Sequence, residues 1–427
     1  MIETFSDKAA FLNEWRQYKS EFTASGLTAA PYLQPEFIRE QMNYAGFDEN
    51  EIDSLRQTAK NIAARPNLSE LFAFTVYHLQ HSPFTAGYGD WPDLKSQLGP
   101  TESCFYLLAA LTLIPVIREK YRALGIPETV NRDTTLEFSG FYRNHIKGCG
   151  VPGIFKGQVY WLKLYRDAQL FRLGRMEYKA EKFGPHGIVL RQQHTGQTVM
   201  LAADGNRYDG RGLALAADAP ADGWKAICRE TPTEFTGHPI RPDGRAEALP
   251  VSLTRTDWEV VLRPGDDIID MHIPPGGGMT PDVCGDSMRQ AAEFFPALLP
   301  ARHFKAIYCN SWIFNPQLEE RLPVSNLAKF MRELYLFPVP GDRFAGMFFV
   351  FCRSGINEAM LPSLPRETSL QRVMLEILES GEDLRYGAMF YLAADLEHFG
   401  MQYYRHHFPG LGAVRKLTLP VAGESAI

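Results

Sequence analysis

An acidic residue and a histidine stand two residues apart in the apolar segment "DDIIDMHI" (266–273). Alternate side chains of a β-strand point to the same face, so Asp270 and His272 are expected to share one face of a strand. A carboxylate beside an imidazole can orient the ring and raise its basicity, which suits a general base near neutral pH. The same two side chains could instead only hydrogen-bond neighbouring backbone or arginine groups. The sequence leaves both interpretations open.

Three consecutive glycines follow this predicted strand. Pro274 and Pro275 end the strand, and the glycines let the backbone turn freely and approach a ligand closely. Thr280 is a good N-cap and Pro281 a good first helical residue, so a helix is expected to begin there. A helix N-terminus suits a phosphate or pyrophosphate, although the early acid Asp282 competes for the same N–H donors. A plain strand–turn–helix connection would explain the glycines without any ligand. The candidate anion-binding residues are Gly276, Gly277, Gly278, Met279 and Thr280.

Two further segments carry candidate polar residues. In "FRLGRMEYKAE" (171–181), alternation places Arg175 and Glu177 on one strand face, where they would line an acceptor pocket or form an exposed ion-paired strand. In "YCNSWIFNPQL" (308–318), Ser311 lies at a predicted strand end and is able to donate a proton to a departing thiolate. Nucleophilic catalysis is a weaker interpretation, because no G-x-S-x-G elbow surrounds this serine.

The composition is that of a globular protein of more than one domain. The chain has 427 residues, of which 45% are hydrophobic and 22% charged, and a net charge of −6. This mildly acidic balance argues against a nucleic-acid partner. The six scattered cysteines indicate reduced thiols, and the acidic N-terminus is unlike a signal peptide, so a cytoplasmic location is expected. The apolar run "CFYLLAALTLIPVI" from Cys104 is too short to span a bilayer and predicts a buried core helix rather than a membrane partner.

The hydrophobic period changes along the chain. Residues 1–150 show successive helical patterns, beginning with Ser6 as an N-cap, and "GCGVPGIFKG" (148–157) is the best boundary. Beyond it come strand-like segments, among them "HGIVLRQQH", "TVMLAAD", "FKAIYCNSWIF" and "GMFFVFC". Helices are expected at 281–297, 316–335 and 367–379, and Thr368 or Ser369 can cap the last of them. The sequence therefore predicts an α+β protein with an all-helical N-terminal domain (1–150) and a mixed-sheet domain (151–427).

Four blocks carry a family resemblance, and they occur in the family's order. The blocks are "LFRLGRMEY" (170–178), "VLRPGDDIIDMHIPPGGGMTPDVCGDSMRQAAEFF" (261–295), "YCNSWIFNPQL" (308–318) and "SNLAKFM" (325–331). Together they resemble the GNAT-like C-terminal domain of a bacterial acyltransferase family in which a helical N-terminal domain comes first. The resemblance implies that acyl-CoA lies in a splayed mixed sheet, with its pyrophosphate at the loop 276–280 and His272 at the end of the central strand.

The expected function is transfer of an acetyl or other acyl group from acyl-CoA to an amine of a small molecule or peptide, without a metal. The alternative is a non-catalytic GNAT-fold protein that binds a ligand or acts as a scaffold. That alternative arises because the loop "IPPGGGMT" lacks the leading Gln or Arg of the usual signature Q/R-x-x-G-x-G/A. A metal-binding jelly roll of the cupin type is a third possibility for the histidine-bearing strand, although Asp270 stands where a second histidine would be needed.

Overall fold

The computed structural model describes residues 2–6, 8–216 and 223–410. Two compact units are present: Met1–Lys179 with Ile273–Gly277, and Ala180–His272 with Gly278–Ile427. We call them the helical unit and the sheet unit. The helical unit also includes residues 151–179 and 273–277. This division into compact units does not test the expected domain boundary at residue 150, which stays a prediction.

The helical unit contains α-helices throughout its first 150 residues, which confirms the predicted all-helical N-terminal region. Asp48 and Glu51 form a capping box that starts α3. Ser6 is not the N-cap of α1, since that helix begins at Ala9 and the Ser6 hydroxyl accepts the N–H of Lys8 at 3.2 Å. The helices are α1 (Ala9–Ser25), α2 (Pro35–Tyr44), α3 (Glu49–Ala63), α4 (Pro66–His81), α5 (Lys95–Leu98), α6 (Glu102–Leu111), α7 (Leu113–Ala123), α8 (Glu128–Cys149) and α9 (Leu162–Arg166).

The apolar run from Cys104 forms the core helix of this unit. Residues 104–111 of α6 are all buried, as predicted. The longer stretch Lys95–Ala123 is apolar enough to cross a membrane by length and composition only, and most of it is buried inside the protein. It is also divided among α5, α6 and α7. These properties are those of a core segment.

A β-hairpin ends the helical unit. Strand β1 (Leu170–Leu173) pairs with β2 (Met176–Lys182) in antiparallel register, and Gly174, with φ +65°, forms the turn together with Arg175. The hairpin packs on α8, where the Thr134 hydroxyl accepts the N–H of Arg172 at 3.0 Å. Strand β2 then continues into the sheet unit.

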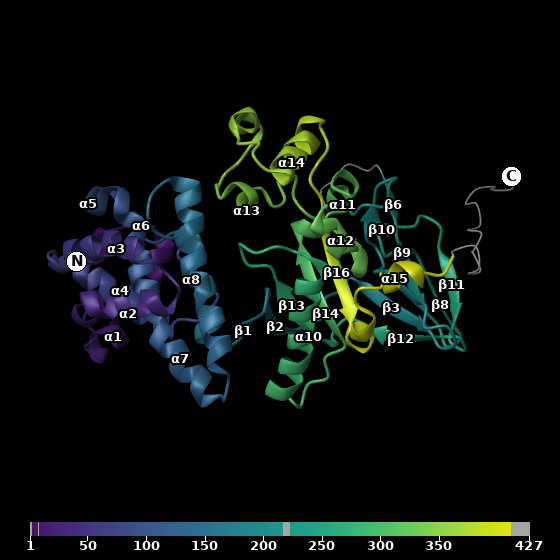
Figure 1. Cartoon of the computed structure of the whole chain (residues 1–427), viewed down its shortest axis with the longest axis horizontal. Coiled ribbons are helices and arrows are strands. Elements are labelled where there is room, and N and C mark those ends of the chain that lie inside the picture. Colours follow the sequence, from purple (N-terminus) through teal and green to yellow (C-terminus); the bar gives the residue numbers. More distant parts are fainter. Residues whose placement is uncertain (1, 7, 217–222, 411–427) are drawn as a thin grey trace, which may run out of the picture. The chain divides into compact units, whose positions relative to one another are not determined.

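The core of the sheet unit is a mixed β-sheet. Strands β13 (Asp267–His272) and β14 (Ala306–Ser311) are parallel, and β16 (Tyr386–Leu392) pairs antiparallel with both β14 and β15 (Tyr335–Val339). Helix α10 (Pro281–Leu298) connects β13 to β14 and lies along the sheet (Figure 1). This arrangement confirms the predicted α+β class. The jelly-roll alternative is wrong, because a jelly roll is built from antiparallel strands.

Smaller sheets lie between β2 and β13 in the chain. A five-stranded sheet has the order β10 (Arg245–Ala246), β9 (Pro239–Arg241), β4 (Thr198–Ala202), β3 (Gly187–Gln192) and β12 (Trp258–Leu262). A three-stranded sheet contains β11 (Val251–Thr254), β8 (Glu234–Gly237) and β7 (Cys228–Glu230), and β5 (Arg207–Tyr208) pairs with β6 (Trp224–Lys225). The Tyr335 hydroxyl accepts the N–H of Met200 at 2.9 Å and donates to the carbonyl of Ile240, which ties the five-stranded sheet to β15.

One sequence-based assignment in this unit is wrong. The segment "GMFFVFC" forms helix α13 (Met347–Phe351) instead of a strand, and it packs in an apolar cluster with α14 (Ser369–Glu379). A short apolar run has no clear period, so its pattern fits a buried strand and a buried helix equally. Three other helices end the list of α-helices: α11 (Pro316–Arg321), α12 (Asn326–Glu333) and α15 (Tyr403–His406). The Thr368 cap of α14 is confirmed.

Candidate functional site

The parallel strands β13 and β14 separate toward their carboxyl ends. Their ladder runs from Ile268↔Ala306 to Asp270↔Tyr308. Beyond that pair, β13 continues to His272 and β14 to Ser311. In open α/β sheets, ligands bind at the carboxyl ends of parallel strands, so the ends of β13 and β14 form the candidate site.

Asp270 and His272 contact each other at this strand end. The Nε2 atom of His272 lies 3.1 Å from the Oδ2 atom of Asp270, and the two side chains are 29% and 12% exposed. When the imidazole is protonated, this contact becomes an ion pair, with Nε2 directed toward the Asp270 carboxylate. The expected contact is therefore present, and the ring is accessible enough to meet a substrate.

Two aromatic rings extend the polar group on the same face. Tyr308 is the register partner of Asp270, and its hydroxyl lies 2.9 Å from Nε2 of His186. Burial raises the pKa of Tyr308, with a smaller contribution from the charge of Asp270, and burial lowers the pKa of His186. Both rings are thus neutral near pH 7. The sequence patterns did not single out either residue, although the alternation in "AIYCNS" (306–311) was an available signal for Tyr308.

Ser311 does not join this group. It stands an odd number of residues after Tyr308, so strand alternation directs it to the other face of the sheet. Its hydroxyl accepts the N–H of Ile313 at 3.4 Å and caps the short 3-10 helix Trp312–Phe314. The exposed residue on the same face as His272 is Asn310. A role for Ser311 as proton donor stays a prediction.

The glycine loop and the start of α10 have the predicted local geometry. Gly276 and Gly277 adopt left-handed φ values of +77° and +64°, which other residues adopt only at a cost. Thr280 is the N-cap residue and Pro281 the first residue of α10, as expected. Among the described residues, the Thr280 side chain makes no capping hydrogen bond. The first-turn N–H groups of α10 are therefore not capped by that hydroxyl. Met279 is half-buried and Gly278 exposed.

Arg175 and Glu177 were expected on one strand face, but only Glu177 lies in a strand, and their role in acceptor binding stays a prediction. Arg175 lies in the hairpin turn before β2, and its Nη1 donates to the carbonyl of Pro274 at 2.9 Å. Glu177 is only 2% exposed, and the Tyr165 hydroxyl lies 3.0 Å from each of its carboxylate oxygens. The alternative expected an exposed strand, and that exposure is wrong for Glu177, because its side chain is buried.

A second buried carboxyl accompanies Glu177 within the helical unit. Glu137 of α8 is 3% exposed, and its Oε2 lies 3.9 Å from Nη1 of Arg172. Burial raises the pKa of Glu137 well above its usual range, and the nearby charge of Glu177 raises it further. Two close carboxyl groups favour one proton between them. Glu137 was missed in the sequence, where its place on the buried face with Thr134 and Phe141 was the available signal.

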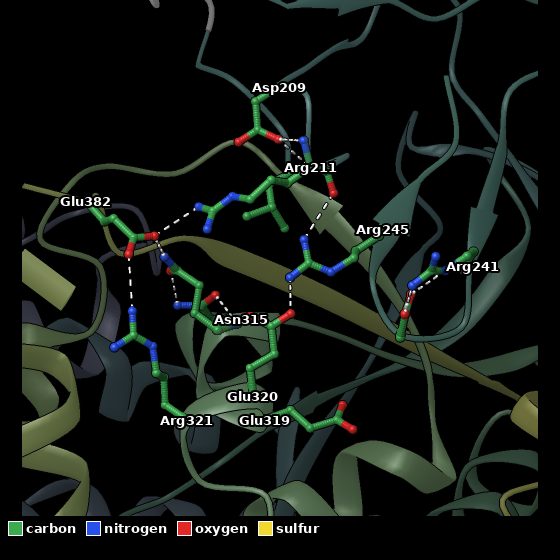
Figure 2. A network of polar contacts seen from close by, with 12 residues as sticks. Asp209, Arg211, Arg241, Arg245, Asn315, Glu319, Glu320, Arg321 and Glu382 are labelled. Carbon is green, nitrogen blue, oxygen red and sulfur yellow. Dashed lines mark hydrogen bonds and ion pairs between the residues drawn. The ribbon is translucent and has the colours of Figure 1, made fainter. Parts of the chain in front are cut away.

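Another concentration of charged side chains in the sheet unit is internally paired (Figure 2). Glu382 contacts Arg211 at 3.0 Å and Arg321 at 3.2 Å. Arg245 contacts Glu320 and donates to the carbonyl of Arg211 at 3.0 Å. Because these groups satisfy one another, the network holds the loop after β5 against α11 and is best explained as structural.

Comparison with known proteins supports the assignment of this fold. Solved acyltransferase structures in complex with octanoyl-CoA, and with decanoyl-CoA and teicoplanin, each share 18% identity and a TM-score of 0.56 with this chain. In both cases the match covers 84% of this chain and 88% of the other. An acyltransferase in complex with decanoyl-CoA matches with 19% identity and a TM-score of 0.54, covering 83% of this chain and 87% of the other. This likeness shows the fold.

The family models cover both parts of the chain. No curated protein matches the sequence. Residues 36–166 match the N-acyltransferase N-terminal domain, and residues 170–390, more than half of the chain, match the GNAT-like C-terminal domain. The chain therefore belongs to the acyltransferase family in which these two domains follow each other.

Proposed function

We propose that the protein transfers an acyl group from an acyl-CoA to an amine of a small molecule or peptide. The observation that carries this proposal is the Asp270–His272 contact at the separated ends of β13 and β14. Family membership supports the reaction class. The structural neighbours in complex with octanoyl-CoA and decanoyl-CoA support a coenzyme A thioester as donor.

His272 is the group that would activate the acceptor. Attack on a thioester requires a neutral amine, whereas an alkylamine near pH 7 is mostly protonated. Nδ1 of His272 takes the proton while Asp270, at 3.1 Å from Nε2, stabilises the imidazolium that forms. The new C–N bond replaces the C–S bond, and the departing CoA thiolate takes up a proton. Ser311, at the end of β14, is the candidate that the sequence offers for that proton, although strand alternation directs its side chain to the other face of the sheet.

The glycine loop is the proposed place of the CoA pyrophosphate. Its two left-handed glycines turn the chain immediately before α10, whose first N–H groups suit an anion. The same loop departs from the usual signature, so coenzyme binding is the first point to test.

A melting experiment with coenzymes separates the enzyme from a non-catalytic GNAT-fold protein. CoA, acetyl-CoA, octanoyl-CoA and decanoyl-CoA are added to the full chain, because a ligand that binds only the folded state raises its melting temperature. We expect at least one acyl-CoA to raise it, and to release CoA thiol when amine acceptors are supplied. Stabilisation without thiol release for any tested amine would favour the binding protein. An unchanged melting temperature with every coenzyme at millimolar concentration contradicts the proposal.

We also infer a bacterial, cytosolic protein without nucleic-acid or membrane partners. The scattered cysteines and the net charge of −6 support this inference. Fractionation of expressing cells tests it, and recovery in a membrane fraction would contradict it.

A further inference from the structure

Arg175 is bound to the beginning of the glycine loop. Its Nη1 donates to the carbonyl of Pro274 at 2.9 Å. A Cβ atom built on Gly277 would lie 3.0 Å from Nε and 3.2 Å from Cδ of the same side chain. The guanidinium group therefore lies directly against the loop at two places, within the helical unit.

The loop sequence itself contains no basic residue. In "IPPGGGMT" (273–280), the Gln or Arg that opens the usual pyrophosphate signature is absent. Arg175 lies 102 residues before Gly277 in the chain (277 − 175), yet the hairpin turn brings it to that loop. An arginine binds phosphate oxygens through a planar, permanently charged fork, so it suits this place.

Glu137 of α8 is an acidic neighbour of Arg175 within the helical unit. Glu137 is close enough for Arg175 to act on its ionisation, but burial and the charge of Glu177 raise the pKa of Glu137 well above its usual range. The raised pKa reduces the negative charge that Glu137 places near Arg175. Arg175 is partly exposed, keeps its positive charge at any pH near neutrality, and lies against the loop.

We propose that Arg175 is a coenzyme-binding residue, whose guanidinium contacts the pyrophosphate of acyl-CoA at 274–277 and replaces the basic side chain that the loop lacks. Arg175 then has a different role from the acceptor binding expected from the sequence. The inference rests on the proposed use of acyl-CoA, and it explains how a loop without the standard signature can still hold the coenzyme.

The test compares Arg175→Gln with the unaltered protein. Glutamine can still donate to the Pro274 carbonyl but carries no charge. We expect the Kd for CoA to rise about 10- to 100-fold, the range of losing one charged phosphate contact at roughly 1.5–3 kcal/mol. The Kd for dephospho-CoA should rise equally, because it keeps the pyrophosphate. Turnover of an S-acyl-pantetheine, which lacks the pyrophosphate, should not change.

Arg172→Gln is the matched control. This arginine comes from the same hairpin and lies beside Glu137, but its contacts are with α8. Arg172→Gln should leave the Kd for CoA within about twofold of the unaltered protein, a difference of ~0.4 kcal/mol.

The outcomes separate the role of Arg175 from the proposed function. If the unaltered protein and Arg175→Gln bind CoA with equal Kd values, only the assignment of Arg175 is overturned. If Arg175→Gln loses as much turnover with S-acyl-pantetheine as with acyl-CoA, Arg175 only shapes the site. If Arg175→Gln weakens the binding of CoA but not of dephospho-CoA, Arg175 contacts the 3′-phosphate instead. Both results overturn the proposal. Failure of the unaltered protein to bind any CoA would instead contradict the proposed function.

Discussion

Two histidine–carboxylate pairs of this protein have similar chemistry but opposite surroundings. In the helical unit, Nε2 of His78 lies 2.7 Å from a carboxylate oxygen of Glu14, and Nδ1 lies 2.7 Å from the Tyr88 hydroxyl. The His78 side chain is fully buried, whereas His272 is 29% exposed and contacts Asp270 at 3.1 Å. His78 thus uses both ring nitrogens inside the fold, and His272 stands where a substrate can reach it.

The surroundings also decide the protonation of the buried ring. Burial is the largest influence and lowers the pKa of His78, while the hydrogen bond that His78 donates to the Glu14 carboxylate opposes that effect. Aromatic rings enclose His78, including Trp91 at 4.8 Å between centroids. A histidine held in this way orients its neighbours but cannot accept a proton from a substrate. The comparison teaches that a carboxylate partner alone does not identify a catalytic histidine, whereas partial exposure at a strand end favours one.

Substitution of His272 should give the largest effect on activity. His272→Ala removes the proposed general base, so kcat should fall by roughly 10²–10⁴-fold with little change in CoA affinity. His272→Gln should behave similarly, because it keeps a hydrogen bond but cannot take the proton. Steady-state kinetics and CoA titration measure both quantities. Full turnover in both variants, with a lower melting temperature, would make His272 a structural residue like His78.

Substitution of His78 should show the opposite pattern. His78→Ala leaves Tyr88 and Glu14 without their ring partner and opens a cavity, so the free energy of unfolding should fall by about 2–4 kcal/mol. The folded variant should retain its kcat at a temperature well below its melting point. Urea unfolding and kinetics on the same sample give both values. A fall in kcat without any loss of stability would contradict the assignment of His78 as structural.

A buried lysine beside His78 makes the helical unit sensitive to pH. Lys163 is 0% exposed, and its Nζ lies 2.6 Å from the Ser82 hydroxyl, which in turn lies 3.3 Å from Nδ1 of His78. Burial, followed by the charge of Arg166, lowers the pKa of Lys163 to about 7 from 10.5. Between these two values the unfolded chain binds the proton that the folded protein releases. The free energy of unfolding should therefore increase with pH over this window.

Lys163→Met provides the comparison for that pH effect. Methionine has a similar length and does not titrate. The unaltered protein should therefore gain stability relative to Lys163→Met between pH 7 and pH 9. Urea unfolding at each pH measures the difference. A constant difference over this range would show that the pKa of Lys163 is not lowered.

The sequence predicted the elements with a clear period better than the residues that tertiary contacts bring together. The strand with Asp270 and His272, the start of α10 and the Thr368 cap follow from alternation and capping rules that act within a few residues. The burial of Glu177 could not be predicted, because it depends on Tyr165 of α9 and on Glu137 of α8. Likewise, Arg175 was assigned to a strand face because the pattern of alternation does not reveal a two-residue turn at Gly174.

The smallest expected effects concern two adjacent glycines, and they test whether the loop serves folding or a ligand. Gly277 has φ +64° and no room beside Arg175, so Gly277→Ala should cost about 1 kcal/mol or more of stability. Gly278 has no left-handed φ, and no described atom lies within 4 Å of a Cβ built on it. Gly278→Ala should therefore change stability by less than about 0.5 kcal/mol.

The same Gly278→Ala variant tests whether the coenzyme passes over the loop. If the pyrophosphate approaches the backbone of Gly278 closely, the added methyl group should raise the Kd for CoA by about 3- to 10-fold, or ~0.7–1.4 kcal/mol. Urea unfolding and CoA titration distinguish the two positions. An unchanged Kd in Gly278→Ala would mean that the coenzyme does not pass over Gly278, and the loop would then be a folding turn at that residue.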